Sequence, residues 1–453
     1  MRPMRFVCAS ALAGGLALEP SAAYAQENVQ AIQQQIDQLR REFDALKQQY
    51  DQRLTALEQR LAGVAAPPAG TQPAVQPPPP TTTPTAQVPS GAEGAGGPSG
   101  ALPVYAGAAA ASKIFNPDIA VIGDFLGAAG KNPAQPDPFA LGGDHPMPLA
   151  MHESEAAFQA VVDPYARADF FLSFGEEGVE VEEGYVTFTS LPGGLLTRVG
   201  KMRAAFGKVN SLHNHVLPWT DRPLVSYNLV GGEDGISDAG LSVARLIPNP
   251  WLFLEATGQV FRGDAGAEGS PLFQTTRRSE MSYVGHLRAY QDITENSNVD
   301  FGASYSRGHN GLLFNSESPD LGSRVTQLYG IDATFRWRPL QRSIYHSFVG
   351  RTEWIWSRRD QEDGLQSGAG TYASADYQFA RRWFVGARYD RSNRATDASL
   401  LDRGGSLLLT YWPSEFSQIR GQYRRTNYAL GPAADEFLFQ FQFSIGAHGA
   451  HPF

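Results

Sequence analysis

The feature that most constrains this chain is an alternation of apolar and polar residues, repeated in runs of about ten from residue 113 onward. The last run shows it clearly, with phenylalanines at 437, 439, 441 and 443 alternating with Leu438, Gln440, Gln442 and Ser444. A period of two predicts β-strands with one apolar and one polar face. Outside the N-terminal segment no stretch of eighteen apolar residues occurs, so no membrane-spanning helix is expected.

The runs and the connections between them predict how the sheet is closed. We expect about sixteen strands, at 118–126, 152–162, 166–175, 179–190, 195–206, 239–247, 251–263, 281–292, 298–307, 325–338, 343–357, 369–379, 383–391, 404–412, 416–428 and 435–445. Short connections alternate with mostly longer ones, which is typical of outer-membrane barrels. Because only closure satisfies every strand in lipid, the sequence predicts an all-β, transmembrane antiparallel β-barrel over residues 113–453. A soluble β-sandwich would explain neither the asymmetry of the connections nor the phenylalanine ladder.

The N-terminal residues predict export. Arg2 and Arg5 precede a short apolar stretch, and Ala23-Tyr24-Ala25 has the form of a cleavage site, so residues 1–25 are expected to be a signal peptide. The single cysteine, Cys8, lies in that segment. The mature chain is therefore expected to hold no disulfide and no thiolate metal site.

Two further segments are expected before the barrel. Residues 26–62 carry an apolar stripe spaced by three and four, formed by Val29, Ile32, Ile36, Leu39, Phe43, Leu46 and Tyr50. So narrow a stripe predicts a coiled coil and hence self-association, with a single-helix tether as the alternative. Residues 63–112 are rich in Pro, Ala and Gly and predict a disordered linker. An even strand number places both ends of the barrel, and so the coil, on the periplasmic side.

Several short motifs resemble known barrels. Val199 to Lys208 is similar to the VGKFK-x-PFG strand of the phosphate-selective porin O/P family, with Ala205 where that family has proline. The resemblance implies a periplasmic coiled coil, sixteen strands and a homotrimer. The stretches 115–118, 151–155 and 217–222 also resemble uncharacterised barrels labelled zinc-regulated TonB-dependent outer membrane receptors. A true TonB-dependent receptor has a plug and typically 22 strands, for which this chain has no room.

These features predict a bacterial outer-membrane porin, a passive channel for small polar or anionic solutes, in contact with lipid and lipopolysaccharide. Sixteen strands leave an aqueous lumen. The alternatives are a structural barrel that tethers the envelope, and a metal-uptake channel. A formal charge of −9 without a basic stripe argues against nucleic-acid binding. No nucleophile motif is present, so neither catalysis nor a cofactor is expected.

Strand parity and loop composition select the residues expected to line the pore. They are Lys201, Arg203, Lys208, His213, His215, Asp221, Arg222, Arg351, Arg388, Arg420 and Arg424. The last four are expected to form a basic wall, or else to pair with neighbouring carboxylates. The long connection 207–238, rich in apolar residues, is expected to fold into the lumen as its constriction. Nine inward cations against seven inward carboxylates suggest a weak preference for anions.

Two groups have metal-ligating residue types. His213 and His215 flank one residue in an extended segment, a spacing that can chelate zinc, but the sequence fixes no third ligand. An acidic run is the second group, and it is equally well interpreted as a charged rim. Its members are Glu176, Glu177, Glu180, Glu182 and Glu183.

Overall fold

The computed structural model describes residues 118–131, 149–175, 178–266, 271–275, 277–310, 324–361 and 364–446. The expected signal peptide (1–25), coiled coil (26–62) and linker (63–112) lie outside the described residues. Among the described residues, no helix is long and apolar enough to cross a bilayer.

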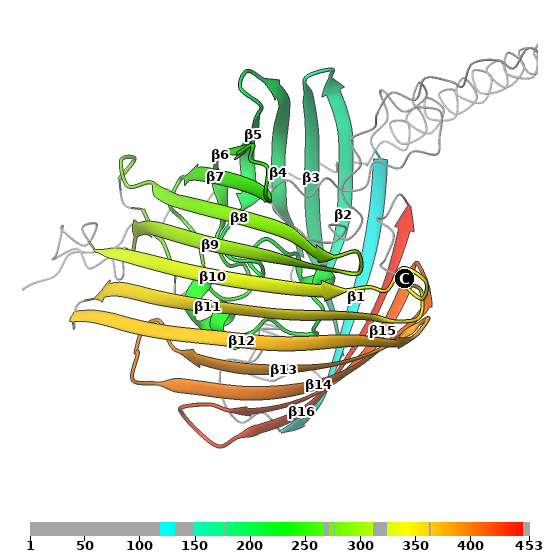
Figure 1. The fold of residues 1–453 in the computed structure, drawn as a ribbon. Helices are drawn as coiled ribbons and strands as arrows, with labels where there is room; N and C mark the ends of the chain where they lie inside the picture. Colours follow the sequence, from blue (N-terminus) through cyan, green and yellow to red (C-terminus); the bar gives the residue numbers. More distant parts are fainter. Residues whose placement is uncertain are drawn as a thin grey trace, which may run out of the picture. The chain divides into compact units, whose positions relative to one another are not determined.

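Sixteen antiparallel strands form one closed barrel (Figure 1). The strands are β1 (Asp118–Lys131), β2 (Leu149–Asp163), β3 (Ala166–Gly175), β4 (Gly178–Leu191), β5 (Leu195–Arg203), β6 (Ser237–Leu246), β7 (Phe253–Phe261), β8 (Ser282–Thr294), β9 (Ser297–His309), β10 (Val325–Trp337), β11 (Ser347–Gln361), β12 (Gly364–Ala380), β13 (Trp383–Asn393), β14 (Leu401–Ser414), β15 (Ser417–Asn427) and β16 (Ala434–Gly446). Each strand pairs with its neighbours in sequence. The barrel closes where β1 lies beside β16, with Ala120 opposite Gly446 and Lys131 opposite Asp435.

The strand pattern confirms the expected all-β class and the number of strands, because alternation is a local property of each run. β3 has the predicted bounds, Ala166–Gly175. One expected long connection, 358–368, is wrong. β11 and β12 continue through it and pair from Gln361 opposite Gly364, which has a φ of 114° that favours glycine. The polar residues of this segment belong to the ends of β11 and β12, beyond the part of each strand that carries exposed apolar residues.

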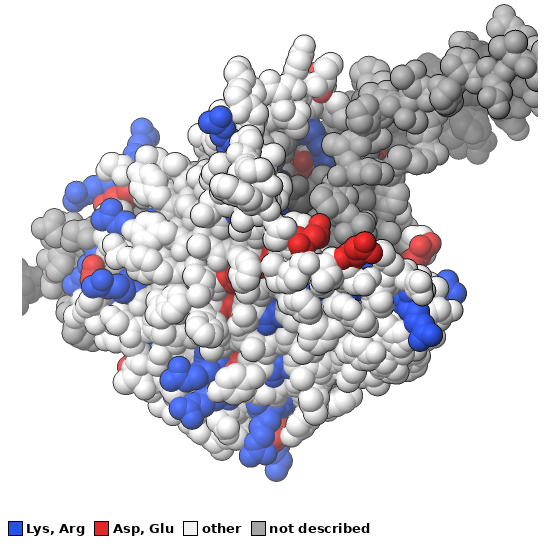
Figure 2. Space-filling model, viewed as in Figure 1, with Lys and Arg blue, Asp and Glu red and all other residues white. Residues whose placement is uncertain are grey.

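The two faces of the sheet differ in chemistry. Outward residues of β16 such as Phe437 and Phe439 are exposed, whereas the inward Gln440 and Gln442 are buried. Figure 2 shows one side of the molecule, on which much of the surface over the strands is uncharged and many Lys and Arg side chains lie near strand ends. The polar groups therefore face a lumen, and what fills that lumen decides the chemistry of the barrel.

Candidate functional site

The connection between β5 and β6, residues 204–236, lies inside the barrel. It contains a short 3-10 helix, η2 (Asn214–Val216), and one helix, α2 (Leu224–Val230). Its apolar residues, among them Val209, Trp219, Val225 and Leu229, are buried in a cluster with inward residues such as Tyr372. We call residues 204–236 the inner loop. Its apolar composition is the signal from which the sequence predicted packing inside the lumen.

The two ends of the inner loop are clamped together. The Asn210 side-chain amide donates to the backbone oxygens of Ala204 (2.9 Å) and Ile236 (3.1 Å), and its oxygen accepts from the Ile236 N–H (2.8 Å). Gly235 has a φ of 64°, and a Cβ there would collide with the Asn210 side chain. Glycine is therefore needed for the loop to turn back into the sheet.

The start of the inner loop is bonded to β9 and β11. The Gly207 N–H donates to Ser304 Oγ (2.9 Å), and the Lys208 N–H donates to Glu353 Oε1 (2.6 Å). The Lys208 ammonium pairs with Asp300 at 2.9 Å. Burial lowers the pKa of Lys208 and outweighs the opposing effect of Asp300.

The middle of the inner loop is anchored to the far wall by Asp221. Its carboxylate accepts from Arg388 Nη2 and Arg424 Nη1, both at 2.9 Å, and from Gln422 Nε2 at 2.5 Å. Burial alone would raise the pKa of Asp221, but the two guanidinium groups outweigh it and hold the pKa at about 2. The neighbouring Trp219 ring lies 5.0 Å from the Arg388 guanidinium carbon and 5.1 Å from the Tyr372 ring centroid.

Backbone groups of the inner loop form further hydrogen bonds to β13 and β15. The Thr220 N–H donates to Gln422 Oε1 (2.9 Å), and the Leu224 N–H donates to Asp390 Oδ1 (3.1 Å). Arg420 donates to the Leu217 carbonyl at 3.0 Å. The inner loop starts at β5 and ends at β6, and its middle is bonded to β13 and β15, which lie about half the strand order away in the closed barrel. It therefore crosses the lumen and narrows it.

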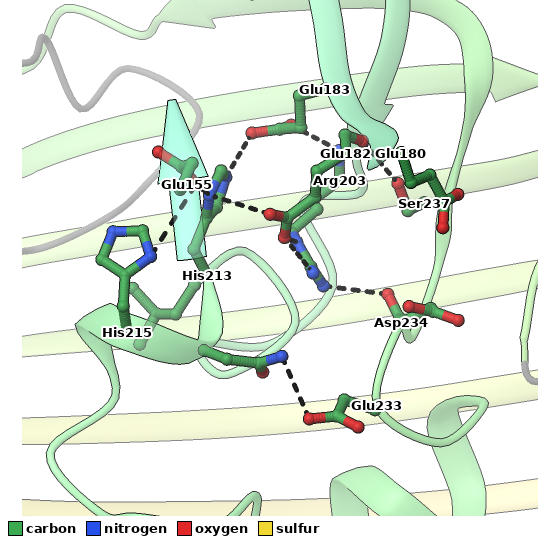
Figure 3. Close-up of polar contacts among 12 residues, drawn as sticks. Glu155, Glu180, Glu182, Glu183, Arg203, His213, His215, Glu233, Asp234 and Ser237 are labelled. Carbon is green, nitrogen blue, oxygen red and sulfur yellow. Dashed lines mark hydrogen bonds and ion pairs between the residues drawn. The ribbon is translucent and has the colours of Figure 1, made fainter. Parts of the chain in front are cut away.

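A third anchor consists of histidines and carboxylates (Figure 3). We define the His213 cluster as Glu155 from β2, Glu182 and Glu183 from β4, and His213 and His215 from the inner loop. His213 Nδ1 contacts Glu155 Oε2, and His213 Nε2 lies 2.7 Å from Glu183 Oε2. The His215 Nδ1 lies 3.8 Å from the same Glu155 oxygen. Arg203 pairs with Glu182.

The carboxylates affect the two histidines differently. Burial would lower the pKa of His213, but Glu182 and Glu155 outweigh burial and raise it well above its ordinary value. Burial lowers the pKa of His215, which is farther from the carboxylates. The cluster therefore places the His213 imidazole in a strongly negative environment, with the His215 imidazole beside it.

The structure places most of the residues selected from the sequence in the inner loop or in contact with it. Asp221, Arg388 and Arg424 meet at the far wall, with Arg420 beside them. Arg351 pairs with Asp376 at 2.5 Å. These four arginines of the expected basic wall are thus bonded to carboxylates or to the inner loop. Arg222 lies within the loop and donates to Asn214 and to backbone oxygens.

Lys201 does not share the inward face. It lies on the face of β5 that bears the exposed Val199, and it pairs with exposed Glu180 at 3.1 Å. β5 carries charge on both faces, with Arg198 packed over the inward Tyr185 ring, so parity alone assigned the wrong face to Lys201. Sequence reasoning also missed the loop partners on distant strands, which are Glu155, Glu182, Asp300 and Glu353.

Comparisons with known proteins place this barrel among its relatives. No protein-family model matches the chain. An uncharacterized protein of Aquifex aeolicus (strain VF5) is 32% identical over 333 residues, which are 67% of this chain and 70% of that protein. The chain belongs to the family of that Aquifex protein.

Solved structures share the fold at low identity. Pseudomonas putida OprB, in a high-pH structure, is 9% identical and has a TM-score of 0.51, with 74% of this chain and 95% of OprB covered. An anion-selective porin from Comamonas acidovorans is 11% identical (73% and 99% covered, TM-score 0.49). The outer membrane channel DcaP of Acinetobacter baumannii is 10% identical (73% and 96% covered, TM-score 0.49). This chain thus shares the barrel fold of OprB.

Proposed function

We propose that this protein is an outer-membrane porin, a passive channel for small polar solutes, with the inner loop as its constriction. The observation that carries the proposal is the path of residues 204–236. They leave and rejoin the wall of a sixteen-stranded barrel at β5 and β6, and they are bonded to β9 at Lys208 and to β13 and β15 at Asp221. A barrel of sixteen strands without such a loop would have an open aqueous lumen. The outer membrane is the location that fits a barrel of this class.

The charges along the lumen bear on which solutes pass. The expected preference for anions rested on a count of nine inward cations against seven inward carboxylates. Further buried carboxylates on the strands include Asp124, Glu155, Asp238, Asp300, Asp402 and Glu436, whereas Arg359 is a further buried cation. Most of the counted arginines are paired with carboxylates. We therefore propose polar solutes as the class, with the anion preference replaced by a weak preference for cations.

The subunits are proposed to assemble as a homotrimer through the predicted coiled coil of residues 26–62. The support is the apolar stripe of that segment, which needs partner helices. Lipid and lipopolysaccharide are the proposed surroundings of the exposed apolar face, which includes Phe437 and Trp354.

Planar-bilayer recording of the purified full-length protein tests the proposal. Stepwise conductance is expected, and deletion of 212–230 in a barrel that still assembles should raise it severalfold, because the narrowest section dominates the resistance. A matched control shortens the connection between β13 and β14 at 396–399, which lies outside the inner loop. A silent barrel, before and after the deletion, would instead support the envelope-tethering alternative.

A further inference from the structure

The nitrogen and oxygen atoms of the His213 cluster are arranged in a way that ion pairs between the same residues do not require. Glu183 Oε2 lies 2.7 Å from His213 Nε2, so a hydrogen on Nε2 is fixed by that carboxylate. Nδ1, the other ring nitrogen, faces Glu155 and Glu182, and a metal ion there would replace its proton (Figure 3). A histidine whose far nitrogen is held by a carboxylate is the usual form of a metal-ligating histidine.

Ligand-type atoms of three other residues, Glu155, Glu182 and His215, lie near this nitrogen. The ligand atoms of Glu155, His213 and His215 all lie within 4.8 Å of one another. Glu182 Oε2 lies 3.5 Å from His213 Nδ1, and Glu155 Oε2 lies 3.8 Å from His215 Nδ1. Donors bonded to a tetrahedral zinc ion at its usual bond lengths are about 3.3 Å apart. The arrangement is close to such a set, with the His213–Glu155 contact opening to admit the ion.

Glu182 supplies an independent observation. The residue is only 7% exposed, and its Oε2 has no hydrogen-bond donor within the described part of the chain. Its other oxygen is held by Arg203, which aims Oε2 at His213. A buried carboxylate oxygen without a donor is costly unless a cation satisfies it.

The net negative charge of the His213 cluster also favours a bound cation. Glu155, Glu182 and Glu183 bring three carboxylates into a buried space, and Arg203 neutralises one of them. The remaining two negative charges match one divalent cation. The mixture of imidazole and carboxylate donors suits zinc and similar transition metals better than the oxygen-binding calcium or magnesium.

We propose that His213, His215, Glu155 and Glu182 bind one divalent transition-metal ion of the Zn²⁺ class. The ion joins the inner loop to β2 and β4, because two ligands come from the loop and one from each strand. Glu183 positions His213 for this role. The site is distinct from the Asp221 anchor, and it does not depend on which solute passes the lumen or on conduction.

A zinc titration of the full-length protein in detergent tests the site. The protein is stripped with chelator, and His448 and His451 are first replaced by glutamine, so that these two neighbouring histidines cannot compete for the ion. Calorimetry with Zn²⁺ alone should give one ion per barrel. Co²⁺ in its place should give the strong visible absorption of a four-coordinate ion, which a carboxylate–imidazolium network does not produce.

Two conservative variants and a control decide the assignment. His215→Gln and Glu155→Gln should each weaken zinc binding at least tenfold, whereas His346→Gln, at a histidine that contacts Tyr377 near β11, should not. Heat-modifiable gel mobility checks that each variant forms the barrel. Absence of zinc binding to the parent protein, or zinc binding in both site variants as tight as in the parent, would overturn the proposal. Bilayer recording of the same samples reports separately on the porin function.

Discussion

Asp221 offers the sharpest test of how the inner loop is held. Replacement by asparagine keeps the shape and removes the charge that Arg388 and Arg424 share. The fall of the Asp221 pKa from its ordinary 3.8 to about 2 corresponds to about 2 kcal/mol of stabilisation of the docked loop. This is below the roughly 3–5 kcal/mol found when buried pairs lose a partner, because both arginines keep a second carboxylate.

Hydrogen exchange measures that energy at the loop itself. The Thr220 and Leu224 amides are bonded to the far wall, so they exchange when the loop undocks. About 2 kcal/mol predicts roughly 30-fold faster exchange in Asp221→Asn. Asp397→Asn is the matched control, because that carboxylate accepts from Ser399 in another connection. Unchanged exchange in Asp221→Asn, or an equal change in both variants, would refute the anchoring role.

The same group predicts the direction of a pH effect. Because the folded-state pKa of Asp221 lies below its ordinary value, the stabilisation is complete above about pH 4. It is lost as the pH falls toward 2. Loop-dependent current fluctuations of the parent protein should therefore increase over that window, and Asp221→Asn should lack this part of the increase.

Three further predictions concern packing, selectivity and assembly. Trp219→Ala removes a ring that is 1% exposed between Arg388 and Tyr372, and should destabilise loop docking by roughly 3–5 kcal/mol, seen as larger and noisier conductance. Reversal potentials in a KCl gradient should show a weak cation preference, and a clear anion preference would contradict the count of inward carboxylates. Deletion of residues 26–62 should weaken the oligomer measured by mass in detergent, and an unchanged oligomer would assign assembly to the barrel walls.

The parts of the fold that sequence predicted are those governed by local pattern. Alternation placed Arg388, Arg420 and Arg424 on the inward face, because side chains in a strand change face at every residue. The apolar residues of the inner loop, such as Trp219, predicted packing rather than exposure. Both inferences need only neighbouring residues.

The partners of those residues needed the closed barrel. Asp221 meets Arg388 and Arg424 across 167 and 203 residues of sequence, which no local pattern specifies. The third ligand for His213 and His215 is Glu155, from a strand 58 residues earlier. For Lys201 the local pattern itself was misleading. β5 carries charged residues on both faces, so alternation could not show which face points inward.

The inner loop also sets an order on assembly. Its contacts from Thr220, Leu224 and His215 are to β15, β13 and β16, which follow it by 202, 166 and 227 residues. A chain synthesised and inserted from its N-terminal end therefore holds an unsatisfied apolar loop until its last strands arrive. Such distant contacts slow folding, since a long segment must be ordered before they form. Closure of β1 on β16 and docking of the loop thus become coupled late steps, and the apolar surface of residues 204–236 stays uncovered until both occur.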